Sequence, residues 1–491
     1  MLDPQEHSNP ITVLALVFAA GSLLGGTASA APSIRLSERA GPPTSETLVS
    51  GRGFSANARV DIYFDTTVAL LIVTDGNGEF EKARIHVPGS AYPGKHWVTG
   101  LEPNDAKSAQ APFLVQTNWS QFHFDARLSG LNPYENVLSP TTVSGMELRW
   151  KFSTANYAWS SAAVVNGVVY VGSEDGNLYA LNAKTGSLVW KLNTGHPVTS
   201  SPAVADGLVY IGTGEGTFYA LDAVTGTKLW RHIGGDPPNA APVVTNGVVY
   251  VGTTVRLYAL NAKTGVQIWS TPIISNTPLA VSGGVVFADS FNALTSTLQI
   301  SALNAATGAS LWSSGSASLV TTPPTVAASV VYFGSDKDVV ALNATTGDQL
   351  WSFTAGDLVL ATPAVANSMV YAGAWDDNLY ALNANTGALL WTFRTAGLVT
   401  SSAAMANGVV YTACNNGNIY ALDASTGILL WTYFVGGVES SPAVANGMVY
   451  LSSFDNNIYA FGLPVGPPAQ PSEVTPPDAE VLRSASHRPS R

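Results

Sequence analysis

Several features that would commit a chain to a function class are scarce in this sequence of 491 residues. It has one cysteine, Cys414, which excludes a disulfide framework, a cysteine-based zinc site and an iron–sulfur cluster. Charged residues make up only 11%, about half of the usual share of ~25%. The sequence has 33 acidic and 22 basic residues, which gives a net charge of −11. It offers no basic stripe that could bind a phosphate backbone or an anionic lipid surface. We therefore expect no nucleic-acid partner.

Long apolar runs are also scarce, and the only candidate lies at residues 11–24, followed by Ala28-Ser29-Ala30. A membrane span needs about 20 apolar residues, so this run predicts a signal peptide over residues 1–30, cut after Ala30. The residues before it include Asp3 and Glu6 and no Lys or Arg, so a misassigned start or a retained anchor stays an alternative. No cysteine follows the run, which excludes a lipoprotein anchor. The sequence predicts a secreted or extracytoplasmic, cell-envelope protein without a membrane span after cleavage.

What the sequence does contain is a repeat. The string YALNAKTGSLVW at residues 179–190 returns with small changes six more times. The tryptophans that close these seven copies recur about every 40 residues, and they are Trp190, Trp230, Trp269, Trp312, Trp351, Trp391 and Trp431. This period, with a tight turn such as Asp206-Gly207 between short apolar strands, is typical of four-stranded propeller blades.

The number of blades follows from how the repeat begins and ends. Signals for the second and the third strand of a blade each occur eight times, but the last copy lacks its closing tryptophan. Residues 147–152, which include Trp150, resemble that missing strand and precede the first blade. We expect this strand to pair with the third strand of the last blade and to close the ring. The prediction is an all-β, eight-bladed β-propeller over residues 147–463.

The repeat resembles the quinoprotein-like propeller family, which includes pyrroloquinoline-quinone (PQQ) dehydrogenases and the BamB-type outer-membrane assembly factors. Its tryptophan-docking motif, A-x-D/N-x-x-T-G-x-x-x-W, is present here as Ala180, Asn182, Thr185, Gly186 and Trp190. The resemblance implies that these tryptophans, together with Trp150, dock between neighbouring blades as structural residues. Residues 118–140 are similar to the segment that precedes such propellers, so residues 118–146 are interpreted as a linker or lead-in.

The remaining segments carry no repeat. Residues 31–117 contain about seven short strands and a strong hairpin tip at Asp75-Gly76-Asn77-Gly78, which predicts a small Ig-like β-sandwich. This module resembles the Ig-like modules of bacterial surface proteins, which implies a spacer or an adhesive unit. Residues 464–491 are rich in proline and polar residues and predict a disordered tail.

The resemblance offers an enzyme as one alternative, a PQQ-dependent dehydrogenase. In that family the quinone lies on the propeller axis, with a calcium ion held by Glu, Asn and Asp, and often with a disulfide between adjacent cysteines. A single cysteine excludes that disulfide, no segment matches the calcium ligands, and nearly every repeat is too short for the insertions that build the enzyme pocket. The sequence therefore predicts no catalytic, cofactor-binding or metal-binding residue. It predicts PQQ with calcium as a cofactor only if this alternative holds.

The favoured interpretation is a monomeric binding or scaffold protein that uses one face of the propeller for a protein partner. Propeller loops between blades and at the tips between second and third strands form such a face. The candidate contact residues there are Tyr157, Trp159, Glu174, His196, Trp375, Asp376 and Glu439. Trp375 is the strongest single candidate, because it is an aromatic residue at a tip and outside the docking motif. A carbohydrate ligand remains a second alternative.

Overall fold

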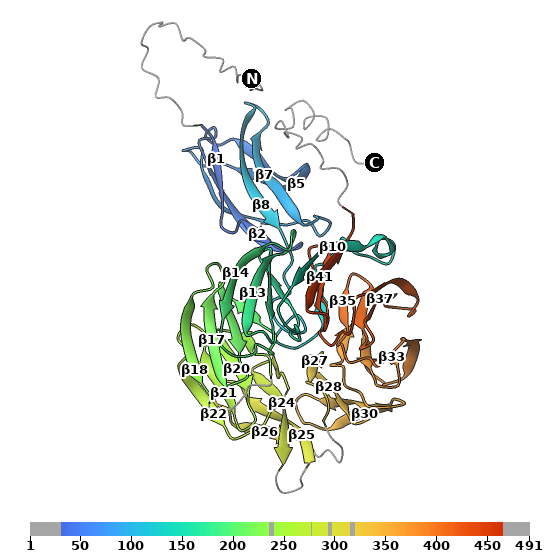
Figure 1. Cartoon of the computed structure of the whole chain (residues 1–491). Coiled ribbons are helices and arrows are strands. Elements are labelled where there is room, and N and C mark those ends of the chain that lie inside the picture. Colours follow the sequence, from blue (N-terminus) through green and yellow to red (C-terminus); the bar gives the residue numbers. More distant parts are fainter. Residues whose placement is uncertain (1–30, 235–239, 276, 293–296, 315–319, 465–491) are drawn as a thin grey trace, which may run out of the picture.

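The computed structural model describes residues 31–234, 240–275, 277–292, 297–314 and 320–464. The predicted signal peptide, and the predicted tail from residue 465 onward, lie outside the described residues. Apart from one 3-10 turn at Val143–Gly145, the regular elements of the described part are strands in ten sheets. Figure 1 shows a small N-terminal module standing on a ring of blades. The predicted all-β class is confirmed.

Seven blades are built from four strands that are consecutive in the chain, with the first strand on the inside of the ring. Blades 1 to 3 consist of β11 (Ala163–Val165), β12 (Val168–Gly172), β13 (Asn177–Asn182), β14 (Leu188–Asn193), β15 (Ala203–Ala205), β16 (Leu208–Gly212), β17 (Thr217–Asp222), β18 (Lys228–Ile233), β19 (Val243–Thr245), β20 (Val248–Gly252), β21 (Leu257–Asn261) and β22 (Gln267–Thr271). Blades 4 to 7 consist of β23 (Ala280–Ser282), β24 (Val285–Asn292), β25 (Thr297–Asn304), β26 (Ser310–Ser313), β27 (Thr325–Ala327), β28 (Val330–Ser335), β29 (Asp338–Asn343), β30 (Gln349–Thr354), β31 (Ala364–Ala366), β32 (Met369–Gly373), β33 (Asn378–Asn383), β34 (Leu389–Arg394), β35 (Ala404–Ala406), β36 (Val409–Ala413), β37 (Asn418–Asp423) and β38 (Leu429–Phe434).

The eighth blade joins the two ends of the ring. Its inner strands are β39 (Ala443–Ala445), β40 (Met448–Ser452) and β41 (Asn457–Gly462), and its outer strand is β10 (Glu147–Ser153). β10 pairs antiparallel with β41 and sets Trp150 opposite Ala460. The predicted closure and the count of eight blades are confirmed, and the closure removes an exposed sheet edge.

A tryptophan of each outer strand packs against the next blade. Trp351 is buried, and its indole nitrogen donates to the carbonyl oxygen of Ala384 at 2.9 Å. Its ring lies against Gly387, where an added Cβ would come within 2.6 Å of the ring. The same contact recurs around the ring, with the indole donors on Trp150, Trp190, Trp230, Trp269, Trp312, Trp351, Trp391 and Trp431. These contacts hold neighbouring blades together.

Replacing Gly387 by alanine is expected to lower the free energy of unfolding by about 2–4 kcal/mol, because the new Cβ meets the Trp351 ring and φ is unfavourable for an L residue. The φ of Gly387 is +72°. Gly207 is the matched control, since its φ is +76° but no atom lies within 4 Å of its added Cβ. Urea unfolding of both variants checks this. Equal losses in G387A and G207A would contradict the docking argument.

The N-terminal module consists of two facing sheets around one apolar core. The strands of the three-stranded sheet are β1 (Ser33–Leu36), β3 (Glu46–Arg52) and β6 (Phe80–His86). The five-stranded sheet holds β2 (Ala40–Gly41), β8 (Lys107–Val115), β7 (Gly94–Glu102), β4 (Arg59–Phe64) and β5 (Thr67–Val73). Val49 from one sheet and Ile62 and Phe113 from the other meet in the core. The Ig-like classification of this module stays a prediction.

Residues 119–132, here called the axial segment, run along the inside of the ring. Seven inner strands donate the backbone N–H of their second residue to this segment. The donors are Val164, Val204, Val244, Val281, Val326, Val365 and Met405, and their acceptors, in order, lie on Trp119, Ser120, Gln121, Ala126, Arg127, Ser129 and Gly130. In the eighth blade, the side-chain nitrogen of Asn132 donates to Val444. The axial segment thus satisfies backbone groups that the inner edges of the blades would leave unpaired.

The two faces of the propeller have different neighbours. The turn face carries the turns between the first and second and between the third and fourth strands of each blade. The N-terminal module lies against this face, where Gln116 donates to Asn166 at 2.8 Å and the backbone N–H of Thr117 donates to Asn446 at 2.7 Å. The opposite face, here called the loop face, carries the connections between blades and the tips between second and third strands. The module leaves the loop face open.

Candidate functional site

The tips of the loop face are fixed by a recurring acidic or amide residue. In blade 1, Asp175 accepts hydrogen bonds from the backbone of Ala155 at 3.0 Å and from the hydroxyl of Tyr179 at 2.7 Å. In blade 6, Asp376 accepts from the backbone of Gly356 at 2.7 Å and from the hydroxyl of Tyr380. Each residue ties a tip to the connection beside it. These bonds hold the loop face rigid enough to present side chains at fixed positions.

An aromatic cluster of Tyr157, Trp159 and Phe454 lies on the loop face where blade 8 meets blade 1. The ring centroid of Phe454 is 5.0 Å from that of Trp159 and 5.8 Å from that of Tyr157. Tyr157 and Trp159 come from the connection between the two blades, and Phe454 comes from the tip of blade 8. Tyr157 remains 43% exposed and Trp159 41% exposed. The cluster therefore offers aromatic surface that the fold itself leaves uncovered.

Acidic residues lie on the same sector of the ring as this cluster. Glu174, at the tip of blade 1, donates its backbone N–H to the carbonyl oxygen of Tyr157 at 2.9 Å. Glu439 lies in the connection that leads into blade 8, two residues after Gly437, whose carbonyl oxygen accepts from the Phe454 backbone at 2.8 Å. Partial burial raises the pKa of the Glu439 carboxyl above its usual range, although the side chain still reaches solvent.

The other predicted contact residues have separate surroundings. His196 lies between blades 1 and 2 and pairs with Glu215, with 2.8 Å between Nδ1 and the carboxylate. Trp375 lies at the tip of blade 6 and is 37% exposed, so it is on the loop face but two blades away from Phe454. The carboxylate of its neighbour Asp376 is occupied by Tyr380 of the same blade and by the backbone of Gly356 in the connection, as described above.

Phe454 is the residue of the cluster that sequence reasoning missed. It occupies the same tip position in blade 8 as Trp375 in blade 6 and Glu174 in blade 1, directly before the residue that ties the tip to its connection. Superposing the tip sequences of the blades would have found it. Its contact with Tyr157 and Trp159 also depends on ring closure, because these residues come from opposite ends of the propeller sequence.

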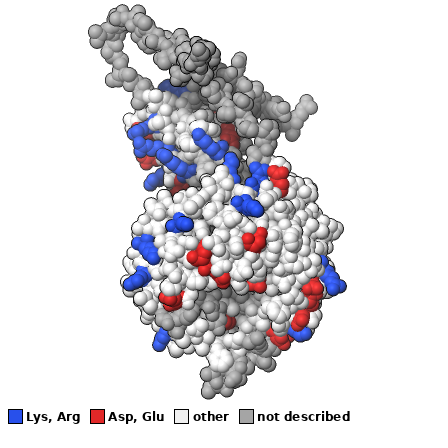
Figure 2. Space-filling view, viewed as in Figure 1, with Lys and Arg blue, Asp and Glu red and all other residues white. Residues whose placement is uncertain are grey.

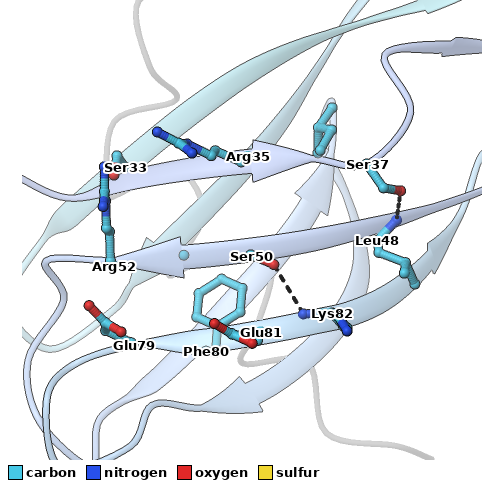
Figure 3. Close-up of a pocket in the computed structure, with 12 residues that line it drawn as sticks. Ser33, Arg35, Ser37, Leu48, Ser50, Arg52, Glu79, Phe80, Glu81 and Lys82 are labelled. Atoms are coloured by element: carbon cyan, nitrogen blue, oxygen red, sulfur yellow. Dashed lines mark hydrogen bonds between the residues drawn. The ribbon is translucent and has the colours of Figure 1, made fainter.

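Hollows in the described residues lie on the N-terminal module and on the turn face. A groove of about 440 Å³ lies on the outer face of β1, β3 and β6 in the N-terminal module (Figure 3). Three cations, on Arg35, Arg52 and Lys82, line it together with the carboxylates of Glu79 and Glu81. Its Ser50 hydroxyl already accepts from the Lys82 backbone. A hollow of about 470 Å³ lies on the turn face between blades 1 and 2. Neither includes a residue of the aromatic cluster.

The sequence profile of one family matches most of the propeller. The family is described as "Outer membrane protein assembly factor BamB", and its profile matches residues 141–298 and 296–464. The chain belongs to this family. The resemblance inferred from the tryptophan-docking motif is therefore confirmed, and the two matched stretches together span the eight blades.

Solved structures share the fold of the BamB-family propeller at low sequence identity. Quinohemoprotein alcohol dehydrogenase from Comamonas testosteroni is 14% identical, with 70% of this chain and 80% of that chain covered and a TM-score of 0.61. BamB from Moraxella catarrhalis is 19% identical, with 65% and 99% covered and a TM-score of 0.56. A europium-containing methanol dehydrogenase is 14% identical, with 70% and 98% covered and a TM-score of 0.59. Searching curated protein sequences gave no match. Such structures show the fold alone.

Because dehydrogenases share this fold, the groups around the axis decide whether calcium, the partner ion of PQQ, could bind there. The residues just before the inner strands form a row of hydroxyl groups, each accepting from the backbone N–H of the preceding blade. The accepting hydroxyls are those of Ser402, Ser441, Ser161 and Ser201, and their donors, in the same order, are the backbone N–H groups of Thr362, Ser402, Ser441 and Ser161, at 2.9 to 3.1 Å. Calcium needs several oxygen ligands, usually with carboxylates among them. Hydroxyls already bonded to backbone do not fit that requirement, and the described residues hold no group of three His, Cys, Asp or Glu side chains that could bind a metal.

A buried histidine lies in the axial segment. His123 Nδ1 is 2.6 Å from the carbonyl oxygen of Leu128, and Nε2 is 2.9 Å from that of Ala403 in blade 7. Burial lowers the pKa of His123 below its ordinary value of 6.5, and this effect outweighs the two carbonyl oxygens, which act in the opposite direction. Partial burial also lowers the pKa of His232. Both side chains are therefore neutral in the folded chain at a pH where they are charged in the unfolded chain.

Stability is expected to fall as the pH falls below about 6.5, because the unfolded chain then binds protons that His123 and His232 do not bind when folded. Each histidine contributes a slope of at most about 1.4 kcal/mol per pH unit between its unfolded and its folded pKa. Urea unfolding at several pH values between neutral and mildly acid checks this, with His123→Gln and His232→Gln as the variants. The slope should shrink in each variant, and an unchanged slope in both would contradict the assignment.

No described residue lies in a helix with the length and hydropathy of a membrane span. Cys414 is buried in the core of blade 7, where burial raises the pKa of its thiol.

Proposed function

We propose that this BamB-family chain is a non-catalytic binding or scaffold protein of the cell envelope, which holds a protein partner on its loop face. The observation that carries the proposal is the aromatic cluster of Tyr157, Trp159 and Phe454, flanked by Glu174 and Glu439, on the face that the N-terminal module leaves open. Exposed aromatic side chains on a rigid scaffold are the typical anchors of protein interfaces.

The tight attachment of the tips supports a preformed interface. Asp175 and Asp455 each bind a tyrosine hydroxyl of their own blade, and thus order the tips on both sides of the cluster. A partner that binds ordered side chains loses less conformational entropy than one that must order them. The N-terminal module, which contacts the turn face, would then serve as a spacer on the side of the propeller opposite the loop face.

The surroundings of the axis support a binding role over the dehydrogenase alternative. The hydroxyl row around Ser161, Ser201 and Ser441 offers no ligand set for calcium, and the axial segment occupies the inside of the ring along all eight inner strands. The family description supports a place at the cell envelope, since it names a factor of outer membrane protein assembly.

Carbohydrate binding is a second candidate, and the exposure of Tyr157 and Trp159 favours it. Aromatic faces pack against the apolar faces of sugar rings, and Glu174 or Glu439 would accept hydrogen bonds from hydroxyl groups. Protein binding is preferred, because the three rings come from the tip of blade 8 and from the connection into blade 1, and neither hollow described above includes any of them.

A photo-crosslinking residue placed at position 196 on the loop face tests the proposal in cells. Val224, which is exposed on the turn face, is the matched control position. We expect one protein partner to be crosslinked from position 196 and not from position 224. Crosslinking from position 224 alone, or the same products from both positions, would overturn the proposal. Loss of glycan binding in Trp159→Ala, without a crosslinked protein, would favour the carbohydrate candidate.

A further inference from the structure

We propose that the loop face selects a cationic partner, namely a protein segment that presents Arg or Lys side chains to the aromatic cluster of Tyr157, Trp159 and Phe454. This inference rests on the proposed function and adds the chemistry of the partner. It is argued from the charges of the loop face, from the rings of the cluster and from the carboxylates that the fold leaves unpaired.

The described connections and tips of the loop face are strongly acidic. They carry nine carboxylates and only two permanent cations. The carboxylates are Glu174, Asp175, Glu215, Asp336, Asp357, Asp376, Asp377, Glu439 and Asp455, and the cations are Arg256 and Lys337. Both cations belong to blades 3 and 5, so the described loop-face residues from the entry of blade 8 to the tip of blade 2 contain no Lys or Arg. The sector that holds the aromatic cluster thus attracts positive charge.

The rings of the cluster suit a cation as well as an apolar side chain. Phe454 lies at interplanar angles of 65° to Tyr157 and 57° to Trp159, so the three rings do not cover one another face to face. The faces that remain exposed carry the negative part of the aromatic quadrupole, which attracts guanidinium and ammonium groups. A planar guanidinium group can stack on such a ring while its N–H groups reach a neighbouring carboxylate.

Two carboxylates of the sector are free to accept such a group. Asp175 and Asp455 are occupied by tyrosine hydroxyls, and Glu215 pairs with His196. Glu174 and Glu439 form no ion pair within the described residues. Partial burial raises the pKa of the Glu439 carboxyl, although the residue is exposed to solvent and open to a partner. An Arg or Lys side chain of a partner would supply a cation to this carboxylate.

The rest of the described molecule lacks this excess of acidic over basic residues. The described part of the N-terminal module holds eight Lys and Arg residues beside nine Asp and Glu residues. In the view of Figure 2, Lys and Arg side chains and Asp and Glu side chains are present on both the module and the propeller below it. The acidic sector is therefore a local property of the loop face and not simply the net charge of the chain.

The test uses the full chain and two labelled extended peptides, one of alternating Gly and Arg and one of alternating Gly and Gln. Binding is followed by fluorescence anisotropy at low and at moderate salt. The test variant is the double substitution Glu174→Gln and Glu439→Gln. The matched control is Asp206→Asn with Asp348→Asn, which removes the same charge from the turn face, where Asn already occupies the position of Asp206 in blade 1.

We expect the Arg peptide to bind at least about 10-fold more tightly than the Gln peptide, and to lose about 10-fold in affinity in the Glu174→Gln, Glu439→Gln variant. Moderate salt should weaken the binding of the Arg peptide to the unsubstituted chain. The control variant should change the affinity for this peptide by less than about 2-fold. Equal binding of both peptides, no binding of either, or equal losses in the two variants would overturn the inference. The crosslinking experiment from position 196 tests the proposed function independently of the partner's charge. If a partner is crosslinked but its affinity changes neither with salt nor in the Glu174→Gln, Glu439→Gln variant, the proposed function stands and the cationic partner is refuted.

Discussion

Replacing Trp159 and Phe454 together by alanine is expected to weaken binding of the loop-face partner at least about 100-fold, because truncated aromatic anchors cost about 2 kcal/mol or more each. Trp159 is 41% exposed and Phe454 is half-buried beside it at the tip of blade 8, and neither side chain belongs to the core cluster of blades 8 and 1. The thermal midpoint should therefore fall by only a few degrees. Titration of the crosslinked partner, once purified, measures the affinity.

Leu311→Ala is the control for this prediction. Leu311 lies in the outer strand of blade 4 and is also exposed, but it is on the circumference of the ring and away from the loop face. It should leave the affinity unchanged. An equal loss of affinity in L311A, or an unaltered affinity in the double variant, would show that the cluster is not the anchor of the interface.

Replacing Trp119 by alanine is expected to lower the free energy of unfolding by about 3–5 kcal/mol, the range for removing a buried tryptophan. Trp119 is the largest fully buried side chain among the described residues, and its backbone exchanges two hydrogen bonds of 2.7 Å with Val164 of blade 1. Its ring lies edge-to-face with Phe124 at 5.3 Å, within the axial segment. The substitution therefore removes an apolar anchor where the axial segment enters the ring.

The thermal midpoint of the Trp119→Ala variant should fall by about 4–8 °C, given the unfolding entropy of a propeller of this size. Trp375→Ala is the matched control, because Trp375 is an exposed tryptophan at the tip of blade 6. It should cost less than about 1 kcal/mol, as surface substitutions usually do. If both variants lost the same stability, the axial segment would not be an integral part of the propeller core.

The blades could be predicted from the sequence because each one carries its own local pattern. The docking motif around Trp190 recurs at a fixed spacing. It predicts the same turn and the same packed tryptophan in each blade. The missing tryptophan after Phe461 and the extra one at Trp150 were enough to predict how the ring closes, and the pairing of β10 with β41 confirms it.

The axial segment could not be predicted in the same way. Its residues form hydrogen bonds to the inner strands mostly through backbone oxygens, as Ser120 and Gly130 do, and backbone acceptors leave no signature in the side-chain sequence. The sequence predicts only a lead-in over residues 118–146, from the resemblance of residues 118–140 to the segment that precedes such propellers. The structure places residues 119–132 along the inside of the ring.

The candidate site was predictable in part. Tyr157, Trp159, Glu174 and Glu439 were found because strand order places connections and tips on one face. Phe454 was missed, because only ring closure brings it to Trp159. Asp376 was singled out as an acid at a tip, but the sequence does not reveal that its carboxylate binds the backbone of Gly356.

The central claim is that this BamB-family propeller binds a partner and performs no PQQ chemistry. Titrating the full chain with PQQ and calcium, while following its thermal midpoint and the reduction of an artificial electron acceptor by alcohols and sugars, tests that claim most directly. A ligand present at 100 times its Kd would stabilise the folded chain by about 2.7 kcal/mol. We predict no saturable shift of the midpoint and no substrate-dependent reduction. A saturable rise accompanied by reduction of the acceptor would contradict the account.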